Sequence, residues 1–140
     1  MDYREVSGGR EFLLTLSYGA DWREEIEAFA AEKSVEAAWF VGTGALEDAD
    51  LQYFDQDAFA YETVSFEEPL EVAACVGSVA LEDGDPVADA HVTLSRPSGQ
   101  AIAGRLDRGT VFAGECYLRT FEEPLERERS ETTGRDGWAV

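Results

Sequence analysis

The chain has 140 residues and a formal net charge of −19, from 30 acidic and 11 basic residues. This length fits one domain with one hydrophobic core, and a hydrophobic content of 44% excludes a chain that is disordered throughout. The excess of acid disfavours direct binding to a phosphate backbone, which needs clustered lysine and arginine.

The sequence carries no signal for a membrane or for export. No apolar stretch approaches the roughly 20 residues that span a bilayer. Residues 1–5 lack the cationic and apolar regions of a signal peptide. We therefore expect a cytoplasmic protein with no membrane partner. Cys75 and Cys116 lie in separate apolar runs, which favours buried, unreactive thiols over a disulfide framework or a zinc site.

The acidic charge also suggests a habitat. Lys33 is the only lysine, and every other basic side chain is an arginine. A charge of this size repels itself and destabilises a compact state at low ionic strength. Salt near 1 M shortens the Debye length to about 3 Å and screens most of that repulsion. The composition therefore predicts a halophilic source.

A strand and a helix are the first predicted elements. Residues 11–18 form a short, apolar, β-favouring run that ends at Gly19. Asp21 then stands three residues before Glu24, which is typical of a capping box. Apolar residues follow at i, i+3 and i+4, so we predict one amphipathic helix over about 22–33, with its apolar stripe on a sheet.

The rest of the domain reads as strands. Glycine-containing turns are predicted at residues 42–44 and 83–86. Consecutive strands joined by short turns imply an antiparallel arrangement. The predicted strands are 37–41, 51–54, 61–66, 70–81, 91–96, 101–106 and 110–121.

The fold class predicted from these elements is α+β. It consists mainly of an antiparallel twisted sheet with one main helix packed on it. Residues 1–129 form a single domain, and residues 130–140 form a polar C-terminal tail in which Trp138 is the candidate for docking on the domain.

His91, the only histidine, opens one of the predicted strands. Strand alternation puts His91 and Thr93 on one face, and Arg105 on the next strand can share that face if the two strands pair across residues 97–100. The register stays open. These three residues are the candidates for a ligand pocket or a subunit interface, and no catalytic residue is assigned.

Metal binding is not expected at His91. A metal site needs several converging imidazole, thiolate or carboxylate ligands. One histidine beside Thr93 and the permanently cationic Arg105 does not supply them. We expect no cofactor, zinc included. A histidine held by hydrogen bonds at a strand start and a small-anion pocket that uses Arg105 both stay open.

The segment 90–114 differs in charge from the rest of the chain. It contains Arg96, Arg105 and Arg108 but only one acid, Asp107, so its formal charge is about +2. A segment spared from surface acid is one that solvent does not reach. We interpret it as core plus a subunit interface, or as a site lined by arginine.

The order of these parts resembles the PPC domain (plants and prokaryotes conserved) over about residues 12–126. The fold is also similar to that of acetolactate decarboxylase, which holds zinc with three histidines. Many prokaryotic PPC members show His-x-His followed by Gly-Gly-His-Leu. Here Thr93 replaces the second histidine and Arg105 the third, so two of three potential ligands are lost. The resemblance rests on Tyr18-Gly19-Ala20-Asp21, Val41-Gly42-Thr43-Gly44-Ala45-Leu46, Leu70-Glu71-Val72 with Gly77, and the segment from His91 to Gly109.

The resemblance implies a homotrimer assembled through its sheets. Stand-alone members are commonly labelled predicted DNA-binding proteins, but no AT-hook-like Arg-Gly-Arg-Pro occurs in this chain. Arg127 and Arg129 alternate with glutamates, which cancels a basic patch and disfavours direct DNA binding. One hypothesis is a regulatory, trimeric interaction module that reaches DNA through DNA-binding partner proteins. The alternative is a small-molecule pocket around His91, for an anion or as a degenerate metal-dependent lyase-like site.

Overall fold

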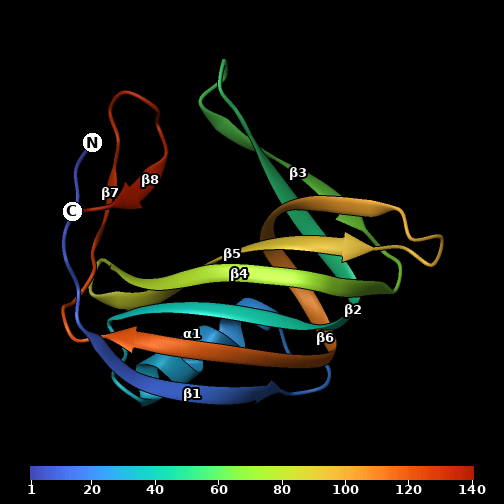
Figure 1. Ribbon diagram of the computed structural model, residues 1–140. Coiled ribbons are helices and arrows are strands. Elements are labelled where there is room, and N and C mark those ends of the chain that lie inside the picture. Colours follow the sequence, from blue (N-terminus) through green and yellow to red (C-terminus); the bar gives the residue numbers. More distant parts are fainter.

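The computed structural model describes all 140 residues and contains one helix and eight strands (Figure 1). Six of the strands form one antiparallel sheet, and the last two form a separate hairpin. The elements in chain order are β1 (Gly8–Leu16), α1 (Trp22–Glu32), β2 (Ala37–Asp55), β3 (Ala60–Phe66), β4 (Leu70–Glu82), β5 (Asp85–Ser95), β6 (Ala101–Phe121), β7 (Arg127–Arg129) and β8 (Asp136–Trp138).

Two long strands, β2 and β6, organise the sheet. They pair with each other over most of their length, and each changes partner along its other edge. Strand β2 pairs first with β4 and then with β3, whereas β6 pairs first with β5 and then with β1. Because β4 also pairs with β5, the strands β2, β4, β5 and β6 close into a ring. The predicted antiparallel sheet with one helix is therefore confirmed.

The predicted turn at residues 42–44 is wrong, because β2 runs straight through it. The register of β2 against β4 shifts between Gly42 and Gly44, which is a bulge and not a chain reversal. A Cβ at Gly44 would collide with the carbonyl oxygen of Ala113, so only glycine allows this close approach. Two predicted strands are consequently one, and β6 likewise joins two predicted strands.

The helix begins at the predicted residue and closes the inner side of the sheet. The Asp21 carboxylate caps it by accepting hydrogen bonds from the backbone N–H groups of Arg23 and Glu24. Its other oxygen accepts from the backbone of Gly109 at 2.9 Å, which ties the helix start to β6. Trp22 and Ile26 are fully buried against the strands. Burial of side chains of this size stabilises the fold by about 1.5–3 kcal/mol each.

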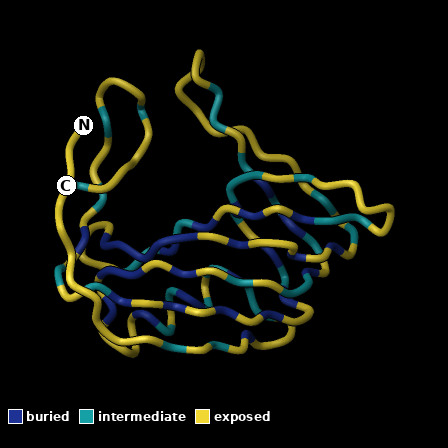
Figure 2. The backbone as a smooth tube through the Cα atoms, viewed as in Figure 1, coloured by how far each residue is buried: buried dark blue, intermediate teal, exposed yellow.

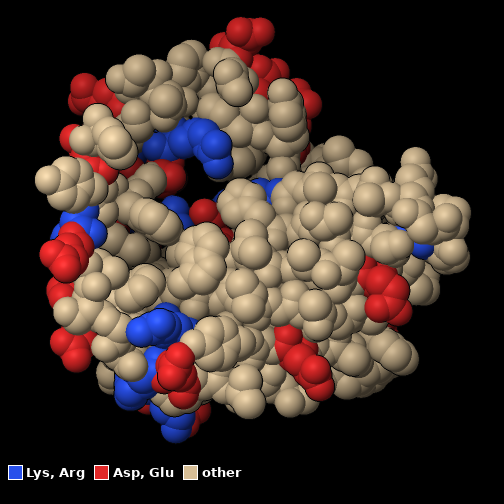
Figure 3. Space-filling view, viewed as in Figure 1, with Lys and Arg blue, Asp and Glu red and all other residues tan.

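The face of the sheet opposite the helix, hereafter the outward face, is only partly covered. Buried and exposed residues alternate along its strands (Figure 2). Four apolar side chains on adjacent strands stand in register across it, and we call them the apolar row. Few charged side chains lie over this part of the sheet (Figure 3). The apolar row consists of Leu13 on β1, Tyr117 on β6, Val41 on β2 and Val76 on β4.

Two arms rise above the other part of the outward face (Figure 1). One is the β2–β3 hairpin, and the other is the β7–β8 hairpin, to which the predicted tail, residues 130–140, contributes. The tip of the second arm approaches the first, because a Cβ on Gly134 would lie 2.8 Å from the Phe59 ring. Trp138 packs its edge on Trp39, with ring centroids 6.3 Å apart. The sequence predicted a polar tail with Trp138 as the docking candidate, and the hairpin that forms the second arm is a finding of the structure.

The single helix has 11 residues and is neither long nor apolar enough to cross a membrane.

Candidate functional site

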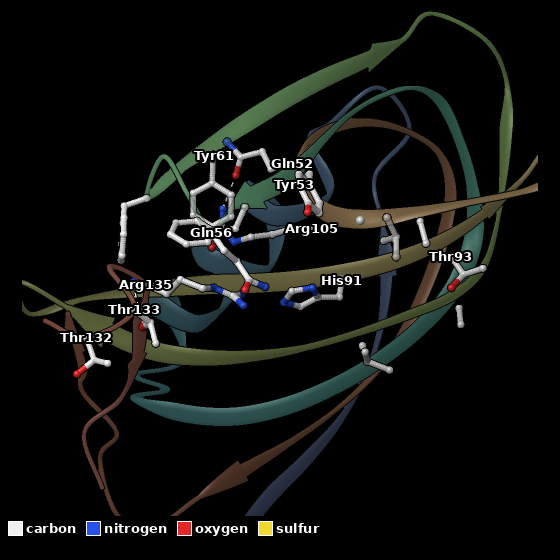
Figure 4. Close-up of a pocket in the computed structure, with 17 residues that line it drawn as sticks. Gln52, Tyr53, Gln56, Tyr61, His91, Thr93, Arg105, Thr132, Thr133 and Arg135 are labelled. Carbon is white, nitrogen blue, oxygen red and sulfur yellow. Dashed lines mark hydrogen bonds between the residues drawn. The ribbon is translucent and has the colours of Figure 1, made fainter. Parts of the chain in front are cut away.

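A pocket of about 710 Å³ lies between the outward face and the two arms. Strands β2 to β6, the turn between β2 and β3, and the C-terminal hairpin all contribute to its walls (Figure 4). It is lined by Gln52, Tyr53, Phe54, Gln56, Phe59, Tyr61, Ala74, Val76, His91, Val92, Thr93, Ala103, Gly104, Arg105, Thr132, Thr133 and Arg135.

All three residues singled out from the sequence line this pocket. His91 on β5 pairs directly with Arg105 on β6, which settles the register that the sequence left open. Thr93 lies two residues further along β5, exposed on the same face. Val92 and Leu94 point to the core, as strand alternation predicted.

Asp89 is the site residue that sequence reasoning missed. Its Oδ1 accepts from Nε of Arg105 at 2.7 Å, and its Oδ2 accepts from Nη2 of Arg127 at 3.2 Å. The His91 Nε2 lies 3.7 Å from the same Oδ2. Alternation along β5 offered a signal, since Asp89 stands two residues before His91 and therefore on the same face.

The two arginines and the histidine set the charge state of Asp89. Burial by itself raises the pKa of this carboxyl group. The neighbouring His91 and the positive charges of Arg105 and Arg127 outweigh burial, and they hold the pKa of Asp89 well below its ordinary value. Asp89 is therefore an anion at neutral pH, shared by two arginines.

Arg105 has three partners in the structure. Besides Asp89, its Nη1 donates to Oε1 of Gln52 at 2.6 Å, and its guanidinium lies over the Tyr61 ring at 5.2 Å from the centroid. Arg105 lines the pocket while its charge is matched by Asp89, and its part in binding an anion stays a prediction. Its role in this structure is to hold β2, β5 and β6 together beneath the pocket.

The other arginines of the positively charged segment 90–114 also have acidic partners. Arg96 pairs with Glu68 at 2.6 Å, and Arg108 pairs with Asp50 at 3.4 Å. These acids, like Asp89, lie outside the segment in sequence and beside it in space. All three arginines of the segment are thus paired across strands, and its interpretation as a subunit interface or an arginine-lined site stays a prediction.

Arg135 is the second residue that sequence reasoning missed, because it lies in the predicted tail. Its guanidinium forms no ion pair and lies over the Phe54 ring, 5.6 Å from the centroid. Figure 4 shows Arg135 and His91 pointing toward one another, with the Gln56 side chain beside them.

The side chains at this position include few of the ligands that zinc takes. His91 is the only imidazole, and the oxygens of the nearby Asp89 already accept from two arginines. No group of three or more His, Cys, Asp or Glu side chains in the chain is arranged to hold a metal.

The two cysteines are buried and unpaired, as the sequence predicted. They belong to β4 and β6, and both are register partners of Gly42 on the intervening strand. Burial raises the pKa of Cys75 and of Cys116 to about 12, so both thiols stay protonated at neutral pH.

Comparison with solved structures shows close similarity over the full chain. A metal-containing protein from Archaeoglobus fulgidus is 35% identical and superposes with a TM-score of 0.95, covering all of both chains. A plant- and prokaryote-conserved protein from Pyrococcus horikoshii is 28% identical, with a TM-score of 0.94 over 100% of this chain and 98% of its own. A candidate DNA-binding protein from Ralstonia eutropha is 25% identical, with a TM-score of 0.83, and the match covers 91% of this chain and 90% of the other.

A more distant structure bears on the fold alone. A Staphylococcus aureus protein of unknown function, similar to alpha-acetolactate decarboxylase, has a TM-score of 0.58 at 12% identity, covering 83% of this chain and 53% of its own. The fold similarity expected from the sequence is therefore confirmed. None of the curated proteins matches this sequence.

The model of the Plants and Prokaryotes Conserved (PCC) domain, written PPC here, matches residues 3–122. This range includes every strand of the main sheet and the helix. It contains His91, Asp89 and Arg105 but not the C-terminal hairpin. The chain belongs to the PPC domain family.

Proposed function

We propose that this PPC-domain protein is a regulatory, homotrimeric interaction module that reaches DNA through partner proteins. The observation that carries the proposal is the apolar row on the outward face. Leu13 is 87% exposed at the sheet edge, and Val41 and Val76 are each 40% exposed. A contiguous apolar surface that solvent reaches is typical of a protein interface.

The proposed occupant of this surface is a second copy of the same chain. A copy that carries 19 excess negative charges is repelled by every acidic part of its neighbour, and the apolar row is the part where that repulsion is weakest. Beside the row, Glu11 on β1 and Arg119 on β6 are register partners, so the surface offers both signs of charge. Contacts in which different surfaces of neighbouring copies meet, called head-to-tail contacts, can close into rings. The family resemblance implies a ring of three copies.

High salt and the absence of a metal are part of the same proposal. A trimer brings three strongly acidic chains together, so its assembly needs the screening of a salt-rich cytoplasm. We propose that the module works without zinc, because Thr93 and Arg105 replace two of the three histidines of the signature that the family resemblance implies.

The oligomeric mass tests the trimer. In molar KCl the wild-type protein should sediment at three times 15.4 kDa. V41E places a charge inside the apolar row and should give monomers with an unchanged circular dichroism spectrum. V64E is the matched control, since Val64 is an exposed strand valine on β3 outside the row, and it should leave the trimer intact. A monomeric wild type, or equal dissociation of both variants, refutes the proposed interface.

DNA binding is proposed to be indirect. Similar proteins described as candidate DNA-binding proteins support an association with DNA. The charge of −19 opposes contact between an isolated chain and the phosphate backbone. Fluorescence anisotropy with a random duplex library should show no binding that survives an increase in KCl. Salt-resistant, sequence-selective binding by the purified protein would overturn the indirect route.

A further inference from the structure

We propose that the pocket between the two arms binds a small organic anion, whose carboxylate or phosphate is held by Arg135. The carrying observation is the charge of the pocket wall. Of the 140 residues, 30 are acidic, yet none of the 17 lining residues is Asp or Glu. The wall does contain two arginines and the only histidine of the chain. In so acidic a protein, a pocket of this composition is suited to a negative ligand.

Arg135 is the cation that is available to such a ligand. Arg105 and Arg127 are both engaged with Asp89, whereas the Arg135 guanidinium has no acidic partner. The Phe54 ring lies on one side of the guanidinium, 5.6 Å from its carbon, and none of the guanidinium N–H groups has an acidic partner. A planar guanidinium donates two parallel hydrogen bonds to a carboxylate or a phosphate, which gives strong and oriented binding.

Other polar groups converge on the same point. Figure 4 shows the His91 ring directed from the sheet toward Arg135. The Gln56 side chain reaches from the β2–β3 arm to a place beside both residues. The hydroxyl group of Thr133 lies on the same hairpin turn as Arg135 and lines the pocket. Asp89 does not line the pocket, and its two arginine partners outweigh its negative charge. Donors thus surround the place where a ligand oxyanion would lie.

The remainder of the wall indicates the rest of the ligand. Tyr61 and Phe54 pack edge to face at 5.0 Å and form an aromatic side, and Val76 adds an apolar floor. The volume of about 710 Å³ lies within the range of about 300–1,000 Å³ that small-molecule sites occupy. These features fit an anion with a flat or branched apolar body better than a bare inorganic ion.

Calorimetric titration of the assembled protein at one fixed KCl concentration tests this site. The probes are benzoate and phenyl phosphate, with benzamide as the neutral analogue of benzoate and inorganic phosphate as the anion without a body. We expect both aromatic anions to bind at least about tenfold more tightly than benzamide and inorganic phosphate. Equal affinity for benzoate and benzamide, or no binding of either aromatic anion, would overturn the proposal.

Two arginine variants then assign the site. R135Q should weaken binding of both aromatic anions by at least about tenfold, because it removes the guanidinium from the pocket. R129Q is the matched control: Arg129 belongs to the same hairpin, faces Asp136 at 3.8 Å, lies outside the pocket, and its replacement changes the net charge equally. An equal loss in both variants would assign the effect to overall charge and refute the Arg135 site. The sedimentation mass of each variant separates this outcome from failure of the trimer.

Discussion

The outward face of this sheet has two halves that differ in polarity and in how far the rest of the chain covers them. Over β1, β6, β2 and β4 lies the apolar row, whose four side chains are all exposed to solvent. Over β5 and the start of β6 lie the charged residues Asp89, His91 and Arg105, and two arms rise above them. Water favours the reverse arrangement, with charges bare and apolar groups covered. The comparison teaches that the two halves suit different partners, which is why we propose a protein surface on one side and a polar ligand on the other.

The two halves are nevertheless continuous. Val76, the last member of the apolar row, is the register partner of His91 on the adjacent strand. Val76 also lines the pocket, so one step across the sheet leads from the proposed interface to the proposed ligand site. The two halves differ in chemistry, because the first exposes apolar side chains and the second contains the ion cluster of Asp89 with Arg105 and Arg127.

The largest expected effect concerns that cluster. D89N keeps the shape of the side chain but leaves Arg105 and Arg127 together without their shared anion, and the Arg127 side chain is only 8% exposed. Loss of one partner from a buried pair is strongly destabilising, so we expect the free energy of unfolding to fall by about 3 kcal/mol in guanidinium chloride titrations. D50N is the control, because the Asp50–Arg108 pair is more exposed and should contribute less than about 1 kcal/mol. Equal losses of unfolding free energy in D89N and D50N would mean that the Asp89 cluster stabilises the fold no more than an ordinary surface ion pair does.

The pH dependence of the same variant sharpens the comparison. The pKa of Asp89 is lowered in the folded state, so its stabilising effect is fully present above the unfolded pKa of about 3.9. The effect diminishes as the pH falls below that value, and it is lost only as the pH falls through the much lower pKa of Asp89 in the folded state. The stability gap between wild type and D89N should therefore be constant near neutral pH and should begin to narrow below about pH 4. A gap that persists unchanged in acid would show that charge is not the cause.

Salt should act on the acidic surface and spare the cluster. Unfolding midpoints of the wild type should rise from low to molar KCl, because screening relieves the repulsion of 19 excess negative charges. The deficit of D89N should change little over the same range, since buried pairs are screened much less than exposed ones. A stability independent of KCl would contradict the halophilic interpretation.

The smallest effect is expected where the C-terminal arm meets the sheet. W138A removes the edge contact with Trp39, and an aromatic pair of this kind contributes about 0.5–1.5 kcal/mol. Trypsin should cut after Arg129 and Arg135 faster in this variant, because the arm opens more often. Y18A, which breaks the similar exposed pair of Tyr18 with Phe112, should leave cleavage of the arm unchanged.

Local sequence signals predicted the fold well where they were strong. The Asp21 cap and the apolar spacing located the helix start correctly, and alternation placed His91, Thr93 and Arg105 on the right face. The failure at Gly42–Gly44 has a physical reason. Glycine marks both turns and bulges, and the choice between them depends on β6 lying close by, which a sequence does not reveal.

The candidate site was only half predictable for a related reason. His91 is conspicuous as a lone residue type, and its neighbours on β5 follow from alternation. Asp89 drew no attention among 30 acidic residues, because its importance comes from Arg105 and Arg127, which are 16 and 38 positions away. Arg135 lies in a polar segment that gave no strand signal in the sequence. The hairpin there, and its contact with the β2–β3 arm, are visible only in the structure.

The three tryptophans are distributed so that they report on different parts of the molecule. Trp22, the first residue of the helix, is fully buried in the core, so its emission belongs to a dry environment and follows global unfolding. Trp39 and Trp138 are both partly exposed, one on the sheet and the other on the arm, and they touch only while the arm is docked. The protein thus contains two spectroscopically separable signals, and movement of the arm over the pocket can be followed by light without a label.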